Sequence, residues 1–190
     1  MAGNECMVSV LCTAYNHEEY IAQTLQCIVD QQTDFAFELL VNDDASTDGT
    51  AAIIRKFEEK YPHIIRAFYQ KDNLYSQHKN AYEAVLFAES RGKYIAFCEG
   101  DDYWSDMTKL QRQVEFLEAH PEYSATTVSA TLPTSVLSAA MTTLIPISIR
   151  SPAAPHTAGT QARSLQRHGC FPSFRNTFIS AGIMRSSTIR

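Results

Sequence analysis

The last third of this chain of 190 residues lacks acidic residues altogether. All 21 Asp and Glu residues lie at or before Glu122, and residues 123–190 contain no Asp, Glu or Lys. The first 122 residues carry 10 Lys and Arg against those 21 acids, whereas the last 68 carry six Arg. So abrupt a change in composition predicts one domain over residues 1–122 and an atypical tail, irregular or disordered, over residues 123–190.

Two explanations of this tail are open. A shifted reading frame or another kind of truncation would account for the sudden loss of Asp, Glu and Lys. Reading the encoding DNA in the other two frames would test this hypothesis. The alternative is a genuine tail that is disordered or docks on a partner.

Other features are also missing, and each excludes a class of protein. The net charge of -5 argues against a nucleic-acid partner, because nucleic-acid-binding proteins usually carry a basic face. The five cysteines form no Cys-x-x-Cys pair, which suits reduced thiols in a cytoplasm. The chain does not begin with a basic segment and an apolar core, and no apolar run approaches the roughly 20 residues that span a bilayer. Neither export nor a membrane span is expected.

Short apolar runs alternate with segments of helical periodicity along the first 120 residues. The predicted strands are residues 7–13, 37–41, 64–69 and 94–98, and the predicted helices begin near residues 16, 48, 80 and 108. This alternation is typical of parallel βαβ crossovers, so we predict an α/β fold of three layers with a mostly parallel central sheet. Ligands of such sheets bind at the carboxyl ends of the strands.

The fourth predicted strand runs into Glu99-Gly100-Asp101-Asp102. Clustered carboxylates after an apolar strand cost free energy unless a cation or hydrogen bonds offset their charge. Mg²⁺ and Mn²⁺ often bind one or two carboxylates together with a substrate's phosphates, which matches this cluster better than a complete protein cage. A nucleoside diphosphate would complete the metal's coordination. The alternative is that Asp101 and Asp102 merely cap the next segment.

The second predicted strand leads into residues 43–49, which match the first half of a calcium-binding EF-hand loop. Arg55 stands where such a loop needs Glu, and a strand precedes the segment where a helix should, so we reject a calcium loop. Residues 46–48 are interpreted as a helix cap. Capping does not explain Asp43 and Asp44, which are candidates for contact with a base or ribose.

The remaining polar and aromatic candidates carry a weaker pattern. The histidines lack metal-ligand spacing and are interpreted as surface or structural residues. They include His17, His63, His78 and His120. Tyr103 and Trp104 either line a sugar pocket or belong to the core.

Three segments together resemble family 2 glycosyltransferases over about residues 7–122. They are Val8–Asn16 (VSVLCTAYN), Phe37–Thr50 (FELLVNDDASTDGT) and Gly92–Trp104 (GKYIAFCEGDDYW), and their order and spacing match too. The last resembles bacterial members associated with surface-polysaccharide assembly. The resemblance implies a GT-A fold and transfer with inversion from a nucleotide-diphosphate sugar, a UDP-sugar, to a glycan or lipid-linked acceptor. Such an acceptor would place the chain in the cytoplasm, in peripheral association with the inner face of a membrane.

The resemblance also implies roles for single residues at the nucleoside end of the donor. Thr13 and Tyr15 match the motif that contacts the nucleotide and its base. Asp44 matches the acid that reads the uracil edge. These three residues lie at or just after the ends of the first and second predicted strands, so the predicted fold brings them to one edge of the sheet.

At the diphosphate end the resemblance implies a divalent cation, Mn²⁺ or Mg²⁺. Asp102 would bind the metal that bridges the phosphates, and Asp101 would contact the ribose and contribute to the metal site. Glu99 stands where many members have the first Asp of an Asp-x-Asp motif. Lys79 would face the diphosphate, an assignment that rests on its position alone. The metal would stabilise charge growing on the departing diphosphate.

One part of the family pattern is missing. An inverting transferase needs a general base, usually Asp or Glu, which the family places well after the metal motif. No carboxylate follows Glu122, so this chain resembles a hexosyltransferase without its base. A non-catalytic nucleotide-sugar-binding fragment is the alternative. A nucleotidyltransferase would need a Gly-rich, basic phosphate loop near the first strand, and residues 13–16 do not form one.

Overall fold

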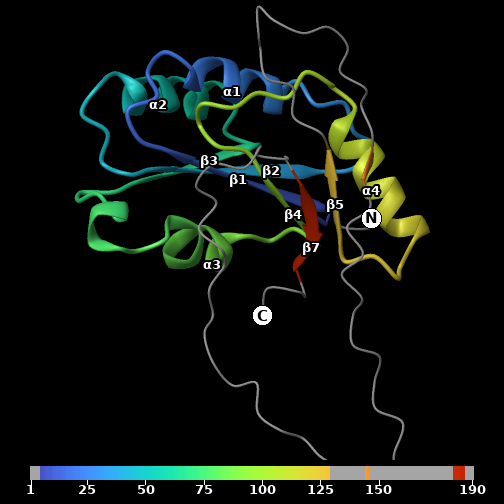
Figure 1. Ribbon diagram of the computed structural model, residues 1–190. Helices are drawn as coiled ribbons and strands as arrows, with labels where there is room; N and C mark the ends of the chain where they lie inside the picture. The colour runs from blue at the N-terminus through green and yellow to red at the C-terminus, as the bar shows by residue number, and fades with distance from the viewer. Residues whose placement is uncertain (1–4, 129–143, 146–181, 187–190) are drawn as a thin grey trace, which may run out of the picture.

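A mixed sheet runs through the centre of the computed structural model, which describes residues 5–128, 144–145 and 182–186 (Figure 1). Its strand order is β3-β2-β1-β4-β7-β5-β6. The strands are β1 (Val8–Ala14), β2 (Phe37–Asp43), β3 (Ile65–Tyr69), β4 (Tyr94–Phe97), β5 (Ala125–Val128), β6 (Leu144–Ile145) and β7 (Ile183–Arg185). The four strands expected from the sequence pair in parallel, and the other three add antiparallel pairs. The predicted α/β fold is confirmed.

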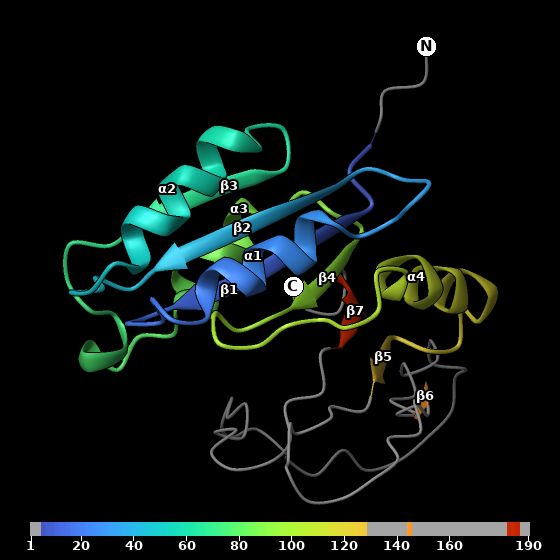
Figure 2. The same ribbon diagram turned by 90° about the horizontal axis from the view of Figure 1, so that it is seen from above.

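Helices cover both faces of the sheet, and α1 and α2 lie across β1, β2 and β3 in the view from above (Figure 2). The helices are α1 (Ile21–Val29), α2 (Thr50–Lys60), α3 (Phe87–Glu89) and α4 (Lys109–Ala119), with a 3-10 turn η1 (Tyr75–Gln77) and a π-helical turn η2 (Tyr82–Leu86). The predicted third helix is therefore a π-helical turn that runs into a short α3. In the described part of the chain, no helix combines the length and apolar character that crossing a membrane requires.

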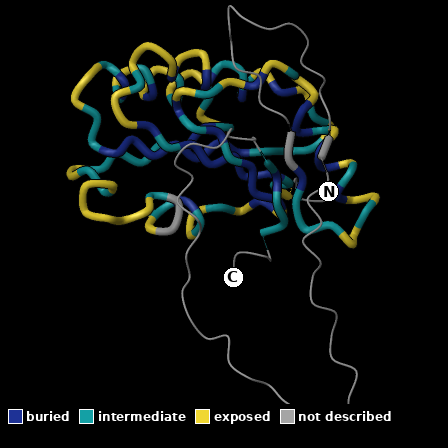
Figure 3. The backbone as a smooth tube through the Cα atoms, viewed as in Figure 1, coloured by how far each residue is buried: buried dark blue, intermediate teal, exposed yellow. Residues whose placement is uncertain are grey.

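β1 lies between β2 and β4, and its side chains contribute to two separate apolar clusters. Val8, Val10 and Cys12 pack in the cluster that includes residues of α1, α2 and α4. Leu11 points to the opposite face and packs with Leu86 of η2. The β1 residues of both clusters are buried, and the dark strands at the centre of Figure 3 mark them. Because successive side chains of β1 point to opposite faces of the sheet, helices pack on both faces and the fold has three layers.

The order of the strands reverses at β1. From β1 the chain adds β2 and then β3 on one side, and it returns to add β4 on the other side of β1. Such a reversal opens a crevice outside the carboxyl ends of the two strands that flank it. The segments that follow β1 and β4 therefore border one crevice.

Three pieces of the predicted tail, β5, β6 and β7, belong to the sheet. β7 pairs antiparallel with β4, where Tyr94 lies opposite Arg185, and β5 pairs with β7. Ile183 is fully buried, and the Arg185 guanidinium donates hydrogen bonds to the carbonyls of Leu117 and Tyr123. The rest of the tail, for which a shifted frame or an atypical segment is predicted, lies outside the described residues.

Lys109, the first residue of α4, carries a buried amine. Its Nζ lies 4.0 Å from the centre of the Trp104 ring and donates a hydrogen bond of 2.8 Å to Oε1 of Gln113. Burial lowers the pKa of the Lys109 amine to about 7, because the charged form loses its hydration. An amine that loses its proton near neutrality makes the stability of the fold depend on pH.

We expect the wild type to gain free energy of unfolding relative to Lys109→Met between pH 7 and pH 9.5. The pKa of Lys in an unfolded chain is about 10.4, so in this range the unfolded state binds a proton at Lys109 that the folded state does not, and the contribution of Lys109 to stability increases with pH. This contribution should be about 3 kcal/mol by pH 9.5, from the folded-state pKa of about 7. Burial raises the pKa of Cys12 and Cys98, whose ionisation in the unfolded chain lowers the stability of both proteins over the same range, so urea unfolding of both proteins at both pH values measures the difference between them. An equal change in both proteins would contradict the prediction.

Candidate functional site

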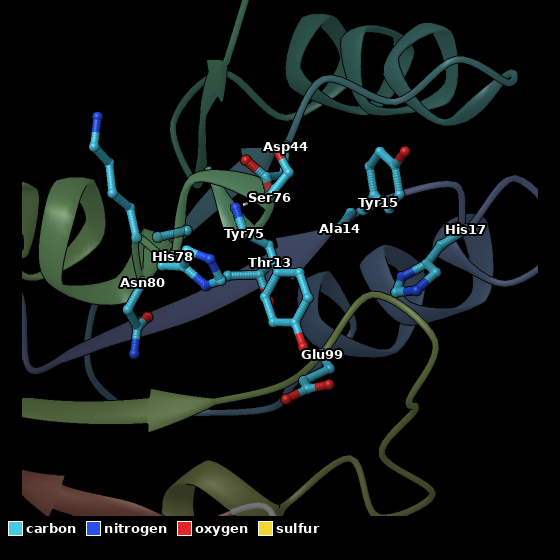
Figure 4. A pocket seen from close by; sticks show the side chains of 12 residues that line it. Thr13, Ala14, Tyr15, His17, Asp44, Tyr75, Ser76, His78, Asn80 and Glu99 are labelled. Atoms are coloured by element: carbon cyan, nitrogen blue, oxygen red, sulfur yellow. Dashed lines mark hydrogen bonds between the residues drawn. The ribbon is translucent and has the colours of Figure 1, made fainter. Parts of the chain in front are cut away.

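A cavity of about 700 Å³ lies at the carboxyl ends of the parallel strands (Figure 4). Its walls come from the segments after β1, β2, β3 and β4. The lining residues are Thr13, Ala14, Tyr15, His17, Asp44, Tyr75, Ser76, His78, Lys79, Asn80, Ala81 and Glu99. The structure therefore brings five of the predicted site residues around one volume, namely Thr13, Tyr15, Asp44, Lys79 and Glu99.

The segment after β1 is tied to the segment after β2. Asn16 has a left-handed backbone with φ 55°, its amide donates to Oγ of Ser46 at 3.0 Å, and its side-chain oxygen accepts from the amide of Thr47 at 2.8 Å. The N-cap of α2 is Gly49, which has no side chain to cap the helix, and not one of residues 46–48 as predicted; Oδ1 of Asp48, the residue before it, accepts from the amide of Thr50 at 2.9 Å. These contacts fix the wall that carries Tyr15.

The acidic turn after β4, Glu99–Asp102, is held by neighbouring segments on two sides. The amide of Gly100 donates to the carbonyl of Thr13 at 2.9 Å, which links the turn to the end of β1. The hydroxyl of Thr24, on α1, lies 3.0 Å from the carbonyl oxygen of Gly100 and 2.6 Å from that of Asp102, so one donor serves both. The position of the carboxylates thus depends on β1 and α1.

The carboxylates of this turn carry negative charge in a partly buried place. Burial raises the pKa of Glu99, and Asp101 and Asp102 raise it further. Burial also raises the pKa of Asp102, which Asp101 increases and His17 opposes. Glu99 and Asp102 form no salt bridge with any described residue, and the nearest approach of a basic group is His17 Nε2, 3.9 Å from Oδ2 of Asp101. A bound cation would relieve this repulsion.

Asp101 and Asp102 do not line the cavity, although their neighbour Glu99 does. Asp101 is exposed and Asp102 is half-buried. Within the described ranges, no three His, Cys, Asp or Glu side chains converge as a metal cage. A cation at this turn would therefore share the carboxylates with oxygens from a ligand.

Asp44 has partners that the sequence did not reveal. Its Oδ1 accepts from the amide of Leu74 at 2.6 Å and its Oδ2 from the amide of Tyr75 at 3.1 Å. Its own carbonyl accepts from the side-chain amide of Asn73 at 3.1 Å. Asp44 is buried and holds the loop that follows β3. Asp43, the other candidate, is the last residue of β2; it is buried and does not line the cavity.

Several lining residues were not predicted. His17 and His78 were interpreted as surface or structural residues, and Tyr75 was not singled out. The sequence did point to their segments, because His17 follows the first strand and the others follow the third. Trp104 is buried with the core and Tyr103 is exposed, and neither lines the cavity.

The cavity at a strand-order reversal, with an acidic turn beside it, is the arrangement expected of the GT-A class of nucleotide-sugar-dependent transferases. A sequence profile of the family described as "Glycosyl transferase family 2" matches residues 9–179. The chain belongs to glycosyltransferase family 2. The resemblance found in residues 7–122 is confirmed.

Two relatives illustrate the extent of the match. An uncharacterized protein of Mycobacterium tuberculosis is 44% identical over 115 residues, which are 60% of this chain and 32% of the relative. The Escherichia coli enzyme UDP-Glc:alpha-D-GlcNAc-diphosphoundecaprenol beta-1,3-glucosyltransferase WfaP is 34% identical over 112 residues, which are 59% of this chain and 41% of that enzyme. The chain thus spans less than half the length of these relatives.

A solved structure supports the fold. The mannosyltransferase PcManGT from Pyrobaculum calidifontis, in complex with GDP-Man and Mn²⁺, superimposes with a TM-score of 0.53 at 25% sequence identity. The match covers 62% of this chain and 34% of PcManGT. The predicted GT-A fold is confirmed.

Proposed function

We propose that this chain forms the donor half of a glycosyltransferase that moves a sugar with inversion from a UDP-sugar to a glycan or lipid-linked acceptor in bacterial surface-polysaccharide assembly. The observation that carries the proposal is the cavity of about 700 Å³ that four segments enclose beside the acidic turn. The WfaP name gives UDP-Glc as the donor of that relative, and PcManGT was solved with GDP-Man. Both names support a nucleotide-sugar ligand for this cavity.

The nucleoside would lie between the segments that follow β1 and β2. Tyr15 offers an exposed aromatic face and Thr13 a hydroxyl at the same wall. Asp44 supports the opposite wall, and its carboxylate is the candidate for the uracil edge. Lys79 would face the diphosphate, because it is the lysine among the described residues that line the cavity.

The acidic turn fits a Mn²⁺ or Mg²⁺ ion, because its donors are all oxygens and its charge is uncompensated. Asp102 and Asp101 would hold the ion, with the diphosphate supplying further oxygens, and Glu99 and Asp101 would face the donor. When bound, such an ion neutralises charge on a departing diphosphate. The hydrogen bonds of the Thr24 hydroxyl and the Gly100 amide hold the turn in a fixed position next to the end of β1.

Nucleotide-sugar binding without transfer is the second candidate, and one observation favours it. No Asp or Glu follows Glu122 in the 190 residues, so the general base expected after the metal motif is not supplied by this sequence. The same observation supports the proposal that residues 123–190 are an atypical or frame-shifted tail. A lipid-linked acceptor would bring the chain to the cytoplasmic face of a membrane.

Titration calorimetry tests the donor proposal. UDP should bind in the presence of Mn²⁺, and chelation of the metal with EDTA should weaken binding at least about tenfold, since the ion supplies direct charge neutralisation. Assays of donor hydrolysis and transfer then separate the two candidates: binding with turnover supports the enzyme, and binding without turnover supports the binding module. Absence of UDP binding in Mn²⁺ would overturn both.

A further inference from the structure

Tyr75 lies outside the predicted site, yet its ring reaches into the cavity. The residue belongs to η1, and its phenol projects across the cavity toward Glu99 (Figure 4). It is 67% exposed, the largest exposure among the large hydrophobic residues of the described chain. An aromatic side chain held open inside a cavity offers a ready contact surface for a ligand.

The backbone that carries Tyr75 is firmly built. Its amide and that of Leu74 both donate to the carboxylate of Asp44. The amide of Lys79 donates to the carbonyl of Leu74 at 2.9 Å, and His78 closes the turn with a left-handed φ of 56°. The loop therefore fixes the starting point of the Tyr75 side chain, and Asp44 joins that loop to the end of β2.

The cavity has a second exposed tyrosine on another wall. Tyr15 is 44% exposed and comes from the segment after β1, whereas Tyr75 comes from the segment after β3. A nucleoside presents flat faces with polar edges, which suit aromatic walls that also carry hydroxyl groups. The phenol of Tyr75 extends from the Asp44 side toward Glu99 of the acidic turn, so it lies between the wall proposed for the base and the turn proposed for the diphosphate.

We propose that Tyr75 is a contact residue for the nucleoside of the donor, and that Asp44 is the positioning residue that presents it. The inference rests on the proposed function and adds a residue to it. The carboxylate of Asp44 accepts hydrogen bonds from two amides of the loop that carries Tyr75. Asp44 then affects nucleotide binding mainly by holding this loop, and less by touching uracil itself.

Calorimetry with UDP and Mn²⁺ tests the role of Tyr75. Tyr75→Ala should weaken UDP binding about tenfold or more, the loss expected for one aromatic contact with a base, whereas Tyr75→Phe should stay within about threefold because the ring remains. Tyr20→Ala is the matched control: Tyr20 is 51% exposed but does not line the cavity, and its removal should change nothing. If Tyr75→Ala binds UDP as the wild type does, the proposal is wrong. Failure of the wild type to bind UDP would instead refute the proposed function.

A double-mutant cycle tests the role of Asp44. On the wild-type background, Asp44→Asn should weaken UDP binding several-fold, because the NH2 group of Asn cannot accept the hydrogen bond that the second carboxylate oxygen of Asp44 accepts from the loop. On the Tyr75→Ala background, the same substitution should have little further effect. Contacting residues in one network couple in this way. Additive effects would overturn the positioning role of Asp44. Thermal unfolding of each variant distinguishes a displaced loop from a lost fold.

Discussion

Replacing Asp102 with Asn should reduce Mn²⁺-dependent UDP binding by at least about a hundredfold. Loss of a residue that merely supports a metal ligand costs about 10–100-fold in metal affinity, so loss of the ligand itself should cost no less. Asn preserves the size of the side chain, and the carbonyl of Asp102 that binds Thr24 is unaffected. The change therefore removes negative charge from a turn whose Asp102 pKa is raised by burial and by Asp101. Calorimetry with UDP, with and without Mn²⁺, measures the effect.

Asp106 provides the matched control for this substitution. It lies four residues further on, and its carboxylate pairs with Arg112 at 3.0 Å and accepts from the hydroxyl of Thr108 at 2.7 Å, outside the acidic turn. Asp106→Asn should leave UDP affinity within about twofold, as usual for surface substitutions. If Asp102→Asn bound UDP in Mn²⁺ as tightly as Asp106→Asn, Asp102 would not hold the metal.

The elements with a strong local pattern were predictable from the sequence. The run Phe37–Val41 forms most of β2, because its apolar residues are buried on both faces of a parallel sheet. β7 could not be predicted in the same way. It has three residues, and it exists because Tyr94 to Ala96 of β4 supply its pairing partners from far along the chain. Such a strand depends on tertiary contacts more than on local propensity.

The candidate site likewise combines residues that the local pattern predicts with contacts that it does not predict. Thr13 lies at the carboxyl end of β1 and Glu99 is the second residue after β4, so the fold alone brings them to the cavity. Asp44 was expected to be available to a base, but its carboxylate accepts the amides of Leu74 and Tyr75. That contact joins residues 30 and 31 positions apart, and no local pattern predicts it. The functional roles of Asp101 and Asp102 stay predictions until the substitutions are measured.

Gly100 should be as sensitive to substitution as the carboxylates beside it. A Cβ atom at this position would lie 2.7 Å from Nδ1 of His17, 2.9 Å from Cβ of Ala14 and 3.0 Å from the carbonyl oxygen of Thr13. Thr13 and Ala14 end β1, an interior strand of the sheet, and cannot move without disturbing its pairing with β2. The acidic turn must shift instead, which displaces Asp101 and Asp102 from β1 and α1.

Gly100→Ala should therefore weaken UDP binding in Mn²⁺ by about tenfold to a hundredfold, the cost of misplacing a binding group by about 1 Å. It should also destabilise the fold by about 1–3 kcal/mol, as overpacking does. Gly49→Ala is the control, because the atoms that its Cβ would meet, at 3.0 to 3.3 Å, belong to the carboxylate end of Glu18, which can rotate away. Calorimetry and thermal unfolding of the two variants separate a displaced turn from a general effect of adding a methyl group. Equal UDP affinity in both variants would mean that the close contact between the β1 and β4 segments does not position the acidic turn.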